Sequence, residues 1–134
     1  MNYKAGGVTI KEAAVKVLDE RDHDTIAALQ AVGVKRNVAT IIVYLKDLGE
    51  VAARDIEKGS GLRQPEVSIA MRTLREKGWI AERDIKNEGR GRPMKLYKLT
   101  VPIDDIIGHY EEKKRNESSR AMQSIQRLKE ISAS

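Results

Sequence analysis

Two short stretches carry polar side chains whose types and spacing suit binding to an anionic polymer. In the first, Gln64, Ser68 and Arg72 recur every four residues, close to the period of a helix. A carboxamide can bond the edge of adenine in two places, and a guanidinium can do the same to guanine. The second stretch, Arg90-Gly91-Arg92-Pro93, places two guanidiniums on a narrow backbone, which fits a DNA minor groove. Both stretches therefore predict contacts with nucleic acid.

The excess of positive charge surrounds these two stretches. The chain has 134 residues and a net charge of +5. Residues 54–98 contain 12 Lys and Arg against 7 Asp and Glu, which gives +5, and the remainder contains 13 against 13. The whole excess thus lies in about one third of the chain, which favours a surface that binds phosphates.

Other classes of site find little support in the sequence. Cysteine is absent, which excludes disulfides and thiolate metal sites. His109 and Glu112 have a spacing that could hold a metal, but a solvated helix face explains them better. Tyr44 and Trp79 could line an effector pocket, and core packing explains them better. Because no convergent catalytic set is found, we expect a protein that is not an enzyme and has no cofactor. Without a signal sequence or an apolar run of membrane length, the expected location is the cytoplasm and not a membrane.

The hydrophobic pattern predicts the elements that position the polar stretches. Apolar residues at helical spacing predict a first helix from Thr9 to Leu18, where Thr9 and Glu12 have the spacing of a capping box. The charged residues Asp19–Asp22 predict a break between this helix and the next one. Further helices are expected at residues 24–32, 37–48, 53–58, 65–77 and 103–131. Two strands, Trp79–Ile85 and Met94–Leu99, should form a hairpin around the polar loop at 86–93.

This order of elements resembles the winged-helix domain of small prokaryotic, especially archaeal, transcription regulators of the ArsR, MarR and TrmB type. The resemblance rests on residues 62–68, 74–80, 89–93 and 97–100, within a region of about half the chain. It implies a mainly α fold with a small β-hairpin wing (α+β): a winged helix-turn-helix with N-terminal helices and a long C-terminal helix. The implied division is an N-terminal helical extension at 1–36, a DNA-binding domain at 37–100 and a dimerisation helix at 101–134.

The implied function is sequence-specific binding of double-stranded DNA by a homodimeric transcription regulator. The helix from Pro65 would enter the major groove, and the Arg-rich wing would contact the backbone or minor groove. The residues predicted to contact DNA are Arg63, Gln64, Glu66, Ser68, Ile69, Arg72, Arg75, Lys86, Arg90, Arg92 and Lys95. Those predicted to line the dimer interface are Ile103, Ile107, Tyr110, Ala121, Ile125, Leu128 and Ile131.

Three points stay open at this level. A winged helix can also serve as a protein-interaction module in a transcription-related assembly, because fold alone does not fix function. An unidentified small-molecule effector is a further partner compatible with the resemblance, although the absence of cysteine argues against metal sensing of the ArsR kind. The operator sequence, and the choice between repression and activation, are not encoded in any recognisable motif.

Overall fold

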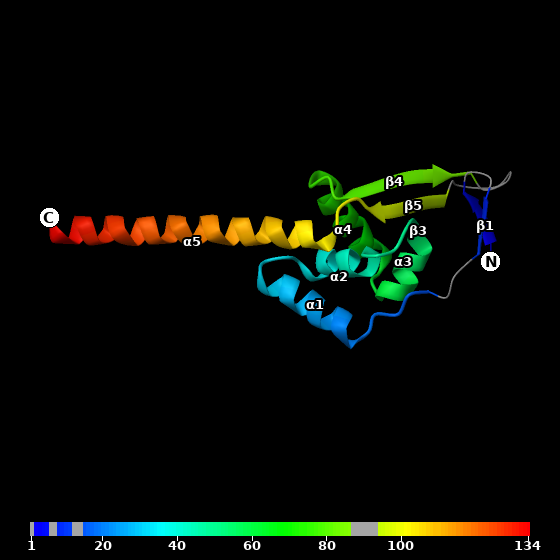
Figure 1. The fold of residues 1–134 in the computed structure, drawn as a ribbon, viewed down its shortest axis with the longest axis horizontal. Helices are drawn as coiled ribbons and strands as arrows, with labels where there is room; N and C mark the ends of the chain where they lie inside the picture. The colour runs from blue at the N-terminus through cyan, green and yellow to red at the C-terminus, as the bar shows by residue number, and fades with distance from the viewer. Residues whose placement is uncertain (1, 6–7, 12–14, 87–93) are drawn as a thin grey trace. The chain divides into compact units, whose positions relative to one another are not determined.

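A computed structural model describes residues 2–5, 8–11, 15–86 and 94–134, with side chains described from residue 15 onward. The described chain is mainly helical with a small antiparallel sheet, as expected for an α+β protein (Figure 1). It forms two compact units, Met1–Pro102 and Ile103–Ser134. The elements are β1 (Asn2–Ala5), β2 (Val8–Lys11), α1 (Glu20–Ala31), α2 (Arg36–Leu45), β3 (Val51–Ala52), α3 (Ala53–Ser60), α4 (Gln64–Glu76), β4 (Ile80–Ile85), β5 (Met94–Leu99) and α5 (Ile103–Ala133).

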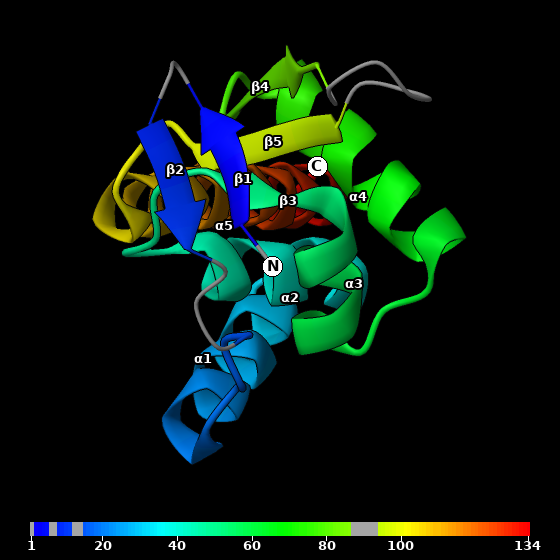
Figure 2. The same ribbon diagram turned by 90° about the vertical axis from the view of Figure 1, so that its right-hand side faces the viewer.

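Helix α2 is the centre of the first unit. Every residue from Val38 to Leu45 is buried, so the helix is covered on all sides. Helix α1 packs on one side of it, and α3 and α4 pack on another (Figure 2). The segment has apolar residues on both faces, which is the pattern of a helix buried all round. The helix ends at Leu45, three residues before the predicted end, and Asp47 takes a left-handed φ of 63° in the link that follows.

The sheet has three strands in the order β3-β5-β4, all antiparallel. Its hairpin is the predicted one, with Ile80 opposite Leu99 and Ile85 opposite Met94. The segment Glu50–Ala52, expected only as an extended link, adds the short strand β3, in which Val51 lies opposite Tyr97. This strand ties the hairpin to the start of α3.

The N-terminal region departs from the prediction. The predicted helix from Thr9 is wrong, because Val8–Lys11 is a strand paired with Asn2–Ala5. The physical reason is the run Val8-Thr9-Ile10, whose β-branched side chains favour extended backbone. Residues 15–19 have no regular structure, and Val17, expected in a buried stripe, is 82% exposed. The N-terminal extension therefore contains a β-hairpin before α1.

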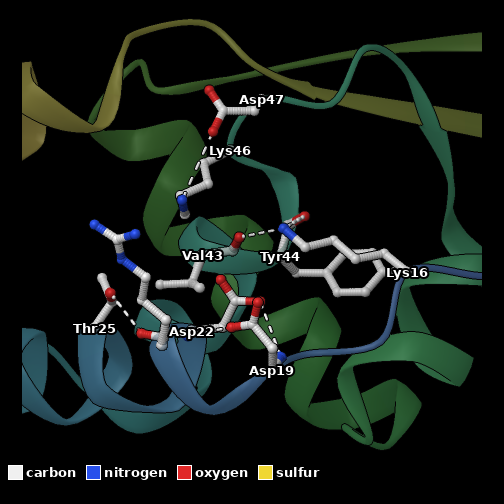
Figure 3. Close-up of polar contacts among 9 residues, drawn as sticks. Lys16, Asp19, Asp22, Thr25, Val43, Tyr44, Lys46 and Asp47 are labelled. Atoms are coloured by element: carbon white, nitrogen blue, oxygen red, sulfur yellow. Dashed lines mark hydrogen bonds and ion pairs between the residues drawn. The ribbon is translucent and has the colours of Figure 1, made fainter.

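Helix α1 begins four residues earlier than predicted. Asp19 and Asp22 form a reciprocal capping box: the amide of Asp22 donates to Asp19 Oδ1 at 2.7 Å, and that of Asp19 donates to Asp22 Oδ2 at 3.1 Å (Figure 3). The bond from the Asp22 amide lowers the pKa of Asp19 below its ordinary value. The charged residues predicted to break the chain therefore start the helix, because carboxylates satisfy its free N–H groups.

Lys16 attaches the extended segment before α1 to the core. Its Nζ donates to the carbonyl oxygens of Val43 at 3.0 Å and Tyr44 at 3.2 Å, in the last turn of α2 (Figure 3). A cation at this position satisfies orphan carbonyls and the negative end of the helix dipole. The Tyr44 hydroxyl in turn donates to the carbonyl of Asp55 in α3 at 3.2 Å. These bonds join the N-terminal segment, α2 and α3.

Replacing Gly59 by alanine is expected to destabilise this junction by about 1–3 kcal/mol. A Cβ at Gly59 would lie 2.6 Å from the carbonyl oxygen of Lys16 and closer still to the Tyr44 ring. The clash opposes the higher helix propensity of alanine, which is worth about 1 kcal/mol. Urea unfolding measures the change. Gly49→Ala is the control, because its Cβ meets nothing within 4 Å; an equal loss in both variants would contradict the packing argument.

The second unit is α5 alone. Ile106 and Tyr110 near its start are buried, and every residue from Glu111 onward is exposed. The helix extends two residues beyond the predicted end at Ile131. No helix of the described chain combines the length and apolar character needed to cross a lipid bilayer.

Candidate nucleic-acid interface

Helix α4 begins at Gln64, one residue before the predicted start, with Pro65 in its first turn. Glu66 Oε1 accepts a bond from the backbone amide of Arg63 at 3.1 Å, which satisfies one of the free donors at the helix start. Val67, Ala70, Met71 and Leu74 recur at helical spacing and are all buried, so they form the inner stripe of the helix. This stripe fixes which face of α4 points away from the core.

The outward face of α4 carries the predicted base-reading side chains. Gln64, Ser68 and Arg72 are exposed, and Ile69 is 52% exposed beside them. Gln64 Nε2 donates to Ser68 Oγ at 2.7 Å, so the carboxamide is held along the helix surface. Within the described residues, neither Arg63 nor Arg72 forms an ion pair. Two guanidiniums are thus available at this face for an external anion.

A tight turn connects α3 to α4. Gly61 has a φ of 75°, a left-handed conformation that suits glycine, and directly after it Leu62 is buried at 3% exposure. Leu62 therefore fixes the turn to the core. Both helices pack against α2 and against each other. The result is a helix, a short turn and a second helix with a free outer face.

The start of α2 adds basic residues that sequence reasoning missed. Asn37 Nδ2 donates to the backbone carbonyl of Glu66 at 3.3 Å, which brings the first turn of α2 to the first turn of α4. Lys35 and Arg36, directly before Asn37, are exposed. The adjacent Lys-Arg pair was a visible signal, but nothing in the sequence related it to α4.

The hairpin and α4 share one carboxylate. Glu82 on β4 accepts a bond from Arg75 of α4 at 2.6 Å and another from Lys95 of β5 at 2.8 Å. The bond from Lys95 and, after it, that from Arg75 hold the pKa of Glu82 below its ordinary value, because both stabilise the carboxylate. Asp84, which lies opposite Lys95 in the hairpin, adds a second negative charge, so the four charged side chains at the junction of α4 and the hairpin sum to zero.

A second ion pair lies on the same strand. Arg83 donates to both carboxylate oxygens of Glu50, at 2.5 and 2.7 Å, and this bidentate pair lowers the pKa of Glu50. Glu50 directly precedes β3, so the pair braces the outer strands of the sheet. Since its charges cancel, Arg83 contributes little to a positive surface.

The predicted contact residues fall into three groups. Arg63, Gln64, Ser68, Ile69 and Arg72 share the outer side of α4, where Glu66 is half-buried and bonds the helix start. Arg75 and Lys95 meet at Glu82, and exposed Lys86 follows β4. Arg90 and Arg92 lie outside the described residues.

The predicted dimer interface lies on α5. Tyr110 is buried within the single chain, whereas Ile107, Ala121, Ile125, Leu128 and Ile131 are exposed.

Other chemistry receives no support at this surface. Among the described residues, no three His, Asp or Glu side chains are grouped as a metal site would require. Tyr44 and Trp79 are buried, at 1% and 9% exposure, as core packing predicts.

The chain matches no protein-family model, and a search of curated proteins finds no match.

Replacing Glu82 by glutamine is expected to destabilise the protein at pH 7 by up to about 1 kcal/mol, as for other exposed ion pairs. Because the folded-state pKa of Glu82 is lowered, its contribution is complete above the ordinary value of 4.5 and disappears as pH falls through the folded value. The difference in unfolding free energy between parent and variant should therefore shrink below about pH 4.5. It should also shrink in about 1 M salt. A difference that is constant with pH would contradict the pairing.

Proposed function

We propose that the chain is a winged helix-turn-helix protein that binds double-stranded DNA and regulates transcription. In this proposal α3 and α4 form the helix-turn-helix, and β4, β5 and the loop between them form the wing. The observation that supports it best is the shared carboxylate of Glu82, which joins the outer side of α4 to both strands of the hairpin. Two elements that each suit DNA are thereby linked directly.

The outer face of α4 has the chemistry to read bases. A major groove is wide enough to admit one helix, and Arg72 could bond guanine or a phosphate there. Gln64 suits adenine, while the exposed methyl groups of Ile69 suit the methyl group of thymine. Ile69 lies on the same outer side of α4 as Ser68 and Arg72, so this surface offers both polar and apolar contacts. The proposed reading surface is therefore mixed in the way that base recognition requires.

The wing would supply contacts that do not depend on sequence. Lys86 is the first residue of the loop at 86–93, and Arg90 and Arg92 follow it in the sequence. Arginines there would neutralise phosphates or enter a narrow minor groove. The exposed pair Lys35 and Arg36 would add charge beside the start of α4. The alternative, a protein-interaction module, has no need for two arginines in an Arg-Gly-Arg-Pro loop.

Duplex binding measured over a range of salt concentrations tests the proposal. The parent chain should bind duplexes with an affinity that falls as salt rises, since phosphate contacts release counterions. Arg90→Ala with Arg92→Ala should weaken binding to all sequences and reduce the salt slope by about 1.8, or about 0.9 for each lost contact. Arg21→Ala on α1 is the control. Duplex binding that is absent, or equal in the parent and the wing variant, would contradict the proposal.

A further inference from the structure

Helix α5 presents an apolar stripe with no cover from its own chain. Seven large apolar side chains are exposed in the described part of the protein, and five of them lie on α5: Ile107, Met122, Ile125, Leu128 and Ile131. At 100° per residue, Ile107 and Ile125 point in the same direction, and Ala121, Met122 and Leu128 lie within about 60° of them, whereas Ile131 lies about 120° away. An isolated helix gains little stability in water, so such a stripe calls for a partner.

The charges of the same helix are separated along its length. Residues 103–112 contain four acidic side chains, Asp104, Asp105, Glu111 and Glu112, and no Lys or Arg. Residues 113–133 contain six basic side chains, Lys113, Lys114, Arg115, Arg120, Arg127 and Lys129, against Glu117 and Glu130. The first third therefore has a charge of −4, and the remainder has +4.

The helix dipole does not account for this separation. A dipole favours acidic residues at the helix start, but its influence fades within the first turn. Asp104 and Asp105 fall in that turn, whereas Glu111 and Glu112 lie about two turns further along. The basic run Lys113–Arg115 is also far from the C-terminal end. The two parts of the helix therefore carry opposite net charges, which a partner with the complementary pattern would match.

We infer that α5 pairs with α5 of a second copy of this chain in antiparallel orientation. In that arrangement the acidic third of each helix lies against the basic part of its partner. A parallel pair would place acid against acid and base against base, which is destabilising. The apolar residues near the two ends also favour antiparallel pairing, because Ile107 then meets Ile125 and Leu128 of the partner.

The polar middle of the stripe is compatible with this pairing. Lys114 Nζ bonds Glu117 Oε2 at 3.2 Å, and Arg115 bonds Glu111 Oε2 at 3.1 Å, both within one helix. These charges therefore already have partners before two chains meet.

Crosslinking of single-cysteine variants tests the orientation in the full chain. The parent has no cysteine, so Ile107→Cys and Ile125→Cys each introduce one reactive group. The two positions lie about 27 Å apart along one helix. One variant carries an added tag, so that crosslinked products of the two chains differ in size. A short bis-maleimide should join Ile107→Cys to Ile125→Cys when the two are mixed, and should join neither variant to itself.

Each alternative result would overturn the inference. Crosslinking of each variant to itself would show a parallel pair. A monomeric mass of the parent in sedimentation, at the concentration of the crosslinking experiment, would show that α5 has no partner of its own kind. The experiment contains no DNA and does not rest on the proposed function. A chain that pairs but fails to bind duplexes would therefore contradict the proposed function alone.

Discussion

Replacing Arg72 by glutamate is expected to weaken binding of a specific duplex by about 1–3 kcal/mol or more, which is roughly a factor of 5 to 150 in Kd. The side chain is exposed on the outer face of α4 and pairs with no described carboxylate. Its guanidinium is thus available to DNA, and a carboxylate in its place would also repel phosphates. Fluorescence anisotropy with a selected duplex and a scrambled one measures both affinity and preference.

Arg21→Glu is the matched control for this variant. It changes the charge of the protein by the same amount, at an exposed position on α1. Helix α1 lies on the other side of α2 from α4 (Figure 2). If binding depends on α4 and not on the total charge, Arg21→Glu should keep most of the affinity. Equal losses of affinity in the two variants would show that Arg72 acts only through the total charge of the protein, and would contradict a specific contact.

Ile41→Ala is expected to lower the free energy of unfolding by about 2–5 kcal/mol. Ile41 is fully buried in α2, between the helices that pack on both sides of it, so truncation leaves a cavity that its neighbours fill only in part. A loss of this size is a large share of the stability of an ordinary domain. Thermal or urea unfolding, followed by circular dichroism, measures it.

The same substitution at Ile69 separates folding from function. Because Ile69 is half exposed on α4, Ile69→Ala should leave the unfolding free energy within about 0.5 kcal/mol of the parent. Its proposed contact with thymine predicts weaker binding to the selected duplex. Destabilisation at Ile69 as great as at Ile41 would contradict the assignment of the α4 faces.

The sequence was most informative where one pattern dominated. The inner stripe of α4 and the double apolar character of α2 predicted their burial, because helical periodicity records which side faces a core. The hairpin strands were predicted to within one residue, since Gly78 and the polar loop mark their ends. In each case a local signal and the tertiary packing agree.

The N-terminal region was mispredicted because its signals compete. Ile10, Val17 and Leu18 fit a helical stripe, but the pair Gly6-Gly7 followed by β-branched residues is equally typical of a hairpin. Likewise, the acidic residues before α1 resemble a loop until Asp19 and Asp22 are seen to cap each other. Local propensity could not decide between these alternatives.

Long-range pairings in the candidate site lay beyond sequence reasoning for a different reason. Glu82 meets Arg75 and Lys95, and Asn37 meets the backbone of α4, across separations that no periodicity encodes. The basic residues of the site were listed singly, without the carboxylate that joins two of them. The exposed Lys35 and Arg36 were overlooked because their proximity to α4 depends on the Asn37 bond.

The turn between α4 and the hairpin sets the geometry of both. The amide of Trp79 donates to the carbonyl of Leu74 at 3.0 Å, and that of Gly78 donates to Arg75 at 3.0 Å, which is the bonding of a Schellman motif with glycine in the left-handed position. Strand β4 begins at Ile80, directly after Trp79, so no flexible linker separates the helix from the sheet. For a protein that binds DNA as proposed, the separation between α4 and the described strands of the hairpin would be fixed. Such a protein would then select its DNA sites by the dimensions of their grooves as well as by their base sequence.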